Sequence, residues 1–232
     1  MKCVVLAAGK GTRMLPLTLD TPKPLLEVAG RPLLEHIMEA FPEEVDEYIL
    51  VVGYLGNKIQ DYFGSEFNGK KISYVIQDEP MGTFHALSLA RKNLKSGERF
   101  FVVHGDDLHG AESIRESLKH PRALIVSHAE DPRPYGVVRT NLAGQIIEIE
   151  EKPEKPKTNL VSTGLLLLDC EVFNYPPDVH SNGEYYLTSS LSQMLEKHPL
   201  YAVESSFWFP VSTPSDLEAC GSLFTTSLSV EN

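Results

Sequence analysis

Residues 6–34 read LAAGKGTRMLPLTLDTPKPLLEVAGRPLL, and this stretch decides the fold. An apolar run just before it predicts a buried strand that ends abruptly in a turn containing Gly9 and Gly11. Glycines at such a turn let a ligand approach the backbone closely and expose backbone N–H groups. Arg13 then offers a planar fork suited to phosphate, and Lys23 a compact positive charge. Prolines restrict the rest of the stretch, so we expect a loop that binds phosphate with cations held in place.

Two common nucleotide-binding patterns overlap with this stretch, and neither fits it. The dinucleotide pattern GxGxxG requires a third glycine where the chain has Met14, and no acid on a following strand serves a ribose. The P-loop pattern requires serine or threonine after Gly-Lys, but Lys10 is followed by Gly11. A dinucleotide-dependent oxidoreductase is therefore disfavoured.

The composition is that of an ordinary globular protein with an acidic balance. Of the 232 residues, 42% are hydrophobic, which suffices for one sizeable core. The formal net charge of −11 disfavours nucleic acid and anionic membranes as partners, because their phosphates would be repelled at long range. A phosphate ligand must therefore meet a local cluster of cations.

The sequence indicates no targeting segment and no cysteine framework. Its longest apolar runs, such as Phe100–Val103 and Leu165–Leu168, are far too short to cross a bilayer. Met1 leads directly into a predicted core strand, so we expect no signal peptide and a cytoplasmic protein. The three cysteines form no CxxC pair, and reduced thiols are expected.

The first half of the chain alternates strand-like and helix-like segments. Such alternation predicts a mostly parallel, Rossmann-like α/β sheet with helices on both faces. The predicted strands are Lys2–Leu6, Glu47–Val52, Ile72–Ile76 and Arg99–His104, and the predicted helices are Pro32–Phe41, Leu55–Phe63 and Thr83–Leu94.

The second half is richer in strands, and we expect it to complete one mixed α/β domain over residues 1–232. Residues 1–110 form its first half, and residues 111–232 form the β-rich half with a C-terminal helix. The predicted strands are Ala123–His128, Gly136–Thr140, Gln145–Glu150 and Ser162–Asp169, followed by helices at Tyr186–Lys197 and Pro214–Leu223.

Two motifs follow strands of the first half. In QDEPMGT, Gln77 ends a strand and Gly82-Thr83 begins a helix; an amide that both donates and accepts matches a pyrimidine edge. In HGDD, Asp106 and Asp107 follow a strand where α/β sheets bind ligands, and one or two carboxylates with substrate phosphates commonly hold Mg²⁺. Taken singly, each motif is better explained as a polar turn.

A third motif, EEKP, ends a strand of the second half. Glu151 and Lys152 would present an acid and a cation to one pocket, where Lys152 suits a sugar phosphate and Glu151 suits sugar hydroxyls. The alternative is a surface ion pair, which contributes little. The histidines His85 and His104 are expected to pack or to form hydrogen bonds.

The opening stretch closely resembles the signature of the sugar nucleotidylyltransferases, LAAGxGTRxxPLTxxxPKPLxxVxGxPL, and the resemblance continues to about Ala219. In that family a sugar 1-phosphate attacks the α-phosphate of a nucleoside triphosphate, giving a nucleotide-sugar and pyrophosphate. The resemblance implies catalytic roles for Arg13, Lys23 and Asp106, with Mg²⁺ on Asp106. It further implies nucleotide contacts from Leu6, Ala7, Ala8, Gly9, Gly11, Thr12, Gln77, Gly82 and Thr83, and sugar-phosphate contacts from Tyr135, Gly136, Glu151, Lys152 and Gly164.

The glutamine at position 77 is most similar to that of the uridylyl- and thymidylyltransferases, although relatives that form ADP-glucose keep a glutamine there too. The expected substrates are UTP or dTTP and, from the family reaction, a hexose 1-phosphate such as glucose 1-phosphate. The sequence departs from the family near the C-terminus, where WxDIGTP is replaced by WFPVSTP. Pro210 stands at the aspartate that gives the metal its second carboxylate, and Ser212 stands at the glycine. The alternative function is therefore a regulatory subunit that binds a nucleotide-sugar without turnover. Apolar residues of the tail, 222–232, suggest a homo-oligomer.

Overall fold

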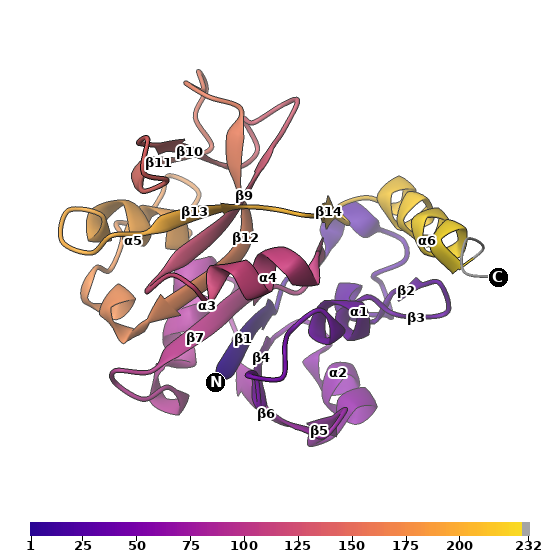
Figure 1. Ribbon diagram of the computed structural model, residues 1–232. Helices are drawn as coiled ribbons and strands as arrows, with labels where there is room; N and C mark the ends of the chain where they lie inside the picture. Colours follow the sequence, from indigo (N-terminus) through magenta and orange to yellow (C-terminus); the bar gives the residue numbers. More distant parts are fainter. Residues whose placement is uncertain (229–232) are drawn as a thin grey trace.

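The computed structural model describes the backbone of residues 1–228 and the side chains of residues 1–223, so most side chains of the tail on which a homo-oligomer was expected lie outside the described residues. Four parallel strands form the centre of the sheet, in the order β7-β1-β4-β6 (Figure 1). They are β1 (Lys2–Ala7), β4 (Glu47–Val52), β6 (Lys70–Ile76) and β7 (Arg99–His104), connected by α1 (Leu33–Glu39), α2 (Gly56–Phe63), α3 (Thr83–Leu89) and the short β2 (Glu27–Val28), β3 (Arg31–Pro32) and β5 (Glu66–Phe67). The predicted parallel centre is confirmed.

The second half extends the same sheet with strands that mostly pair antiparallel. The long β12 (Leu160–Asp169) pairs with β7, so it joins the two halves at the middle of the molecule. The further elements are α4 (Ala111–Ser117), β9 (Ala123–His128), β10 (Gly136–Thr140), β11 (Ile146–Glu151), α5 (Leu187–Met194) and β13 (Tyr201–Glu204). The sheet is therefore mixed, with ten strands in all among the described residues.

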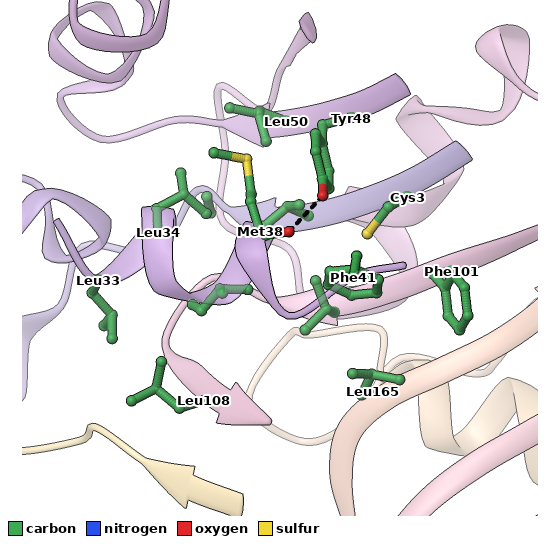
Figure 2. Close-up of a cluster of buried hydrophobic side chains, with 14 of the residues drawn as sticks. Cys3, Leu33, Leu34, Met38, Phe41, Tyr48, Leu50, Phe101, Leu108 and Leu165 are labelled. Carbon is green, nitrogen blue, oxygen red and sulfur yellow. Dashed lines mark hydrogen bonds between the residues drawn. The ribbon is translucent and has the colours of Figure 1, made fainter. Parts of the chain in front are cut away.

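Alternate residues of the central strands fill two separate cores, one on each face of the sheet. On β1, Cys3 and Val5 point into the core beneath α1, which Figure 2 shows, whereas Val4 points into the core beneath α3 and α5. Within the first core the buried Tyr48 hydroxyl donates to the Met38 carbonyl oxygen at 2.6 Å, so this polar atom is satisfied. Helices on both faces, as predicted, follow from this alternation.

Several boundaries differ from prediction. The helix expected over Thr83–Leu94 ends at Leu89, because the Ala90 N–H donates to the Leu87 carbonyl oxygen and tightens the last turn before a 3₁₀ segment, Arg91–Asn93. The C-terminal helix α6 (Pro214–Leu228) runs beyond its predicted end. No helix in the described part of the chain has the length and apolarity needed to span a membrane.

A small ribbon of two strands, β8 (Asp107–His109) and β14 (Trp208–Pro210), was not expected. The two strands pair antiparallel, and the pairing brings a segment near the C-terminus against the Asp-rich turn after β7 (Figure 1). Strands of three residues, one of which contains Pro210, carry no periodic signal, so the sequence pattern could not reveal them. The ribbon positions part of the site described next.

Candidate active site

The glycine-rich turn after β1 is a rigid loop with a buried cation. Gly11 has φ +60°, and a Cβ there would lie 3.0 Å from the Thr18 side chain, so only glycine fits without strain. The Thr18 hydroxyl donates to the Gly11 carbonyl oxygen at 2.9 Å and closes the loop. Pro22 then starts a 3₁₀ turn that holds Lys23, whose side chain is only 8% exposed. The expected phosphate-binding loop is thus preformed.

The Lys23 side chain forms an ion pair with Asp106, the first aspartate of the HGDD motif. Its Nζ lies 2.5 Å from Asp106 Oδ2, although the two residues are 83 positions apart in the chain. The loop after β1 and the turn after β7 therefore face each other across the carboxyl ends of adjacent parallel strands, where α/β sheets bind ligands.

Two adjoining cavities open at this place. The first, which we call the loop cavity, has a volume of about 380 Å³ and the second, the sheet cavity, about 500 Å³. Both are lined by Arg13, Asp106 and Ser212, so these residues lie at their junction. The predicted residues on the loop cavity are Leu6, Ala7, Gly9, Gly11, Thr12, Arg13, Lys23 and Asp106, and those on the sheet cavity are Arg13, Thr83, Asp106, Tyr135, Gly136, Glu151, Lys152 and Gly164.

The pKa values of the neighbouring carboxyl groups of Asp106 and Asp107 are shifted in opposite directions. Burial alone would raise the pKa of Asp106, but the charges of Lys23, His104 and Arg13 hold it below its usual value. Burial and the charge of Asp106 raise the pKa of Asp107 to about 6. Burial would lower the pKa of His104, but its hydrogen bond to Asp107 and the nearby carboxylates raise it. The half-buried Asp106 and the buried Asp107 lie close enough to favour a bound cation, which would let both ionise.

The donor set at the junction fits a divalent metal. Ligand atoms of His104, Asp106 and Asp107 lie within 4.8 Å of one another. Carboxylate oxygens with substrate phosphates are the ligands that hard cations such as Mg²⁺ take. The Pro210 side chain carries no donor atom, so the second family carboxylate has no counterpart at that position. Asp106, with Asp107 beside it, would hold the metal.

Lys152 is held in a strained and well-supported position beside the sheet cavity. Its φ of +45° is rare for a residue with a side chain, and its N–H donates to the Tyr135 carbonyl oxygen at 3.0 Å. The Nζ lies 4.3 Å from the ring centroid of Tyr186 and donates to its hydroxyl at 3.2 Å. Burial would lower the pKa of Lys152, but Tyr186 and Glu151 raise it, so the ammonium stays charged.

The Glu151 carboxylate of the EEKP motif is also held in place by neighbouring residues. The Thr188 hydroxyl donates a short hydrogen bond to Glu151 Oε2. Gly136 passes so close that a Cβ would lie 2.8 Å from Thr188 Cγ2 and 3.3 Å from the Glu151 carboxylate. Gly164 is similarly confined on β12, since a Cβ there would lie 2.4 Å from His104 Nδ1. The glycines of this cavity thus make room for functional side chains.

Ala8, Gln77 and Gly82 line neither cavity, unlike the other predicted nucleotide contacts. They nevertheless lie at the edge of the site. The backbones of Ala8 and Gln77 come together at Gly53, just after β4, where an added Cβ would lie 2.9 Å from the Ala8 carbonyl oxygen and 2.7 Å from the Gln77 carbonyl oxygen. The Gln77 amide nitrogen lies 3.4 Å from the Gly82 carbonyl oxygen. The ends of β1, β4 and β6 therefore converge beside the loop cavity.

Sequence reasoning missed several side chains that the fold adds to the site. Tyr186 and Thr188 were only part of a predicted helix, and His104 was expected to pack or to form hydrogen bonds, without a place in the site. The HGDD string could have indicated His104, because a histidine two residues before an aspartate pair at a strand end is a suitable ligand position. No local pattern could have paired Tyr186 with Lys152, since they come from different elements.

Comparison with known proteins assigns the family. The nucleotidyl transferase family model matches residues 2–226. The chain belongs to the nucleotidyl transferase family. Among curated relatives, the bifunctional protein GlmU of Methanococcus maripaludis is 36% identical over 97% of this chain and 54% of its own length. The chain thus spans about half the length of such relatives.

Other similar proteins are matched over more of their own length. The UTP–glucose-1-phosphate uridylyltransferase AglF of Haloferax volcanii is 34% identical over 84% of each chain. A crystal structure from Bacillus anthracis, assigned as a glucose-1-phosphate thymidylyltransferase in complex with sucrose, aligns with a TM-score of 0.81 at 27% identity, covering 96% of this chain and 94% of its own. A UDP-glucose pyrophosphorylase complexed with UDP-glucose has a TM-score of 0.84 at 23% identity, covering 97% and 98%, and supports the fold. The resemblance to the sugar-1-phosphate nucleotidyltransferases and the α/β fold are confirmed.

Proposed function

We propose that this chain transfers a nucleotidyl group from UTP or dTTP to a hexose 1-phosphate, releasing pyrophosphate. The observation that carries the proposal is the junction of the two cavities at Arg13 and Asp106, where a nucleotide in one cavity meets a sugar phosphate in the other. The activity of the relative AglF, a UTP–glucose-1-phosphate uridylyltransferase, supports glucose 1-phosphate as the sugar substrate. Residues 1–110 would bind mainly nucleotide and residues 111–232 mainly sugar.

In the proposed reaction, a phosphate oxygen of the sugar 1-phosphate attacks the α-phosphorus, and the bond to pyrophosphate breaks. The attacking oxygen is already anionic and pyrophosphate leaves without protonation, so no general base is required. The protein contributes alignment and positive charge around the α-phosphate. Arg13 at the junction and Lys23 in the loop cavity would bind the triphosphate, and Lys152 would bind the sugar phosphate.

A divalent metal, proposed as Mg²⁺, would be held by Asp106 together with Asp107. When bound, it neutralises charge on the phosphates. Lys23 keeps Asp106 ionised and oriented through their 2.5 Å contact. Glu151, held by Thr188, faces the sheet cavity and would accept hydrogen bonds from sugar hydroxyls.

The test is pyrophosphate release with Mg²⁺, crossing UTP, dTTP, GTP, CTP and ATP against glucose, mannose, galactose and N-acetylglucosamine 1-phosphates. We expect one favoured pairing, with the product mass confirmed and the activity abolished in Asp106→Ala. The exposed Asp61→Ala serves as the control for loss of a carboxylate outside the two cavities. Nucleotide-sugar binding by calorimetry without turnover in any pairing would contradict the proposal and favour a regulatory subunit.

A further inference from the structure

Gln77 is a buried side chain whose amide hydrogens are both used inside the protein. Only 6% of the residue is exposed. Its Nε2 lies 2.9 Å from His85 Nδ1 and 3.4 Å from the Gly82 carbonyl oxygen. An amide nitrogen has two hydrogens, so these two acceptors take both.

The Gly82 contact also decides which way the amide faces. A carbonyl oxygen can only accept a hydrogen bond, so the nitrogen of Gln77 must lie on the side of Gly82 and the oxygen on the opposite side. His85 Nδ1 is then an acceptor, and the imidazole proton is on Nε2. Within residues 1–228 the Gln77 amide oxygen has no hydrogen-bond partner, which leaves it as the group that a ligand can use.

The backbone around Gln77 is anchored and cannot readily reorient the amide. Gly82 has φ +94°, and a Cβ there would lie 2.5 Å from the Tyr185 carbonyl oxygen. The same carbonyl oxygen accepts from the Phe84 N–H at 2.9 Å, and the Tyr185 N–H donates to the Met81 carbonyl oxygen at 2.9 Å. The backbone of Tyr185, in the second half of the chain, thus fixes the loop before α3 and the start of this helix, which carries His85.

We propose that His85 is a positioning residue that sets the base selectivity of the enzyme by fixing the orientation of Gln77. This inference rests on the proposed function and on the nucleotide contacts of Ala8 and Gln77 that the family resemblance implies. With both amide hydrogens engaged, Gln77 presents only its acceptor oxygen. It therefore selects a pyrimidine whose ring nitrogen carries a hydrogen, as in uracil and thymine. Cytosine has an unprotonated acceptor at that nitrogen and is rejected, because two acceptors would face each other.

Three substitutions separate this role from a packing role. His85→Leu keeps a side chain of similar volume without an acceptor, and His85→Ala removes the ring. His85→Asn places an amide oxygen near the position of Nδ1 and should restore the hydrogen bond. For each variant, kcat/KM is measured for UTP and CTP with the preferred sugar 1-phosphate, together with the affinity for each nucleotide by calorimetry and the melting temperature.

We expect the wild-type chain to prefer UTP over CTP, and the preference to fall by about tenfold in His85→Leu and His85→Ala. It should recover in His85→Asn. An equal loss for both nucleotides, an unchanged ratio, or a wild-type preference for CTP would overturn the role of His85. The calorimetric ratio tests the inference even in a chain without turnover, so failure of the proposed function is seen separately as absence of pyrophosphate from every pairing.

Discussion

Pro210 lies directly opposite Asp107 in the ribbon of β8 and β14. The next residue, Val211, donates its N–H to the Asp106 carbonyl oxygen at 3.0 Å, so the ribbon holds the backbone of this position against the carboxylate pair. The family pattern has aspartate where this chain has Pro210. The chain therefore keeps the backbone of this position beside the carboxylate pair and lacks only the carboxylate of the family pattern.

Replacing Pro210 with aspartate should therefore strengthen metal binding. In Pro210→Asp, the added carboxylate reaches the cluster of Asp106 and Asp107, and we expect the Mg²⁺ concentration for half-maximal activity to fall about tenfold. Calorimetry of Mn²⁺ binding in the presence of nucleotide provides a readout independent of turnover. Pro210→Ala is the matched control, since it removes the ring without adding a ligand. Equal metal affinity in the two variants would show that the position does not reach the ion.

The Tyr186 hydroxyl should matter for the sugar phosphate and not for the nucleotide. Tyr186→Phe removes the hydroxyl that Lys152 contacts at 3.2 Å but keeps the ring face 4.3 Å from its Nζ. We expect KM for the sugar 1-phosphate to rise about three- to tenfold, with KM for the nucleoside triphosphate unchanged. Tyr175→Phe, whose ring packs on His198 away from both cavities, is the control. A rise in both KM values would indicate a general structural effect.

The site could be predicted from sequence to the extent that its parts are local. Glycine and proline act on their own backbone, so the loop with Gly11 was readable from a single string, as was Asp106 at a strand end. Contacts between distant segments were not readable. The pairing of Lys23 with Asp106 joins positions 83 residues apart, and the support of Lys152 by Tyr186 depends on how α5 approaches β11. These depend on tertiary packing, for which a single sequence holds no pattern.

The same limit applies to the ribbon. The string that contains Asp107 has the composition of a turn, yet it forms β8 because Trp208–Pro210 is brought alongside it. Each of the two strands has only three residues, so the pairing leaves no periodic trace in the sequence. The consequence for function is that Pro210 could be recognised as a missing ligand only from the family pattern, whereas its place opposite Asp107 needed the structure.

The Glu47 carboxylate on β4 links this strand to its two neighbours, β1 and β6. Its contribution to the free energy of unfolding should depend on pH. Burial would raise its pKa, but hydrogen bonds from Ser73, Lys71 and Lys2 lower it below the usual value. A depressed pKa means that the stabilisation is present above the unfolded pKa of about 4.5 and is lost as pH falls through the folded value. Glu47→Gln should therefore lower the free energy of unfolding by about 1–3 kcal/mol at pH 7, and by much less at about pH 3.

Urea unfolding at the two pH values measures this difference. Glu98→Gln is the control, because its pairing with Lys95 is exposed at 3.7 Å and should contribute little at either pH. A Glu47→Gln effect that is the same under both conditions would mean that the side chain acts through packing and not through its charge.

Gly164 should be required for a reason beyond its backbone conformation. Its φ is +80°, and a Cβ would lie 2.4 Å from His104 Nδ1, so Gly164→Ala should displace the imidazole from Asp107. Gly183 is the matched control: its φ is +85°, and a Cβ added there would meet nothing within 4 Å. Both alanine variants incur backbone strain of about 1–3 kcal/mol, but only Gly164→Ala adds a clash inside the sheet cavity. We expect Gly183→Ala to melt earlier with near-normal kcat. Gly164→Ala should melt earlier still and lose metal affinity and most of its kcat. Equal losses in the two variants would mean that φ alone accounts for the glycine and that contact with His104 plays no part.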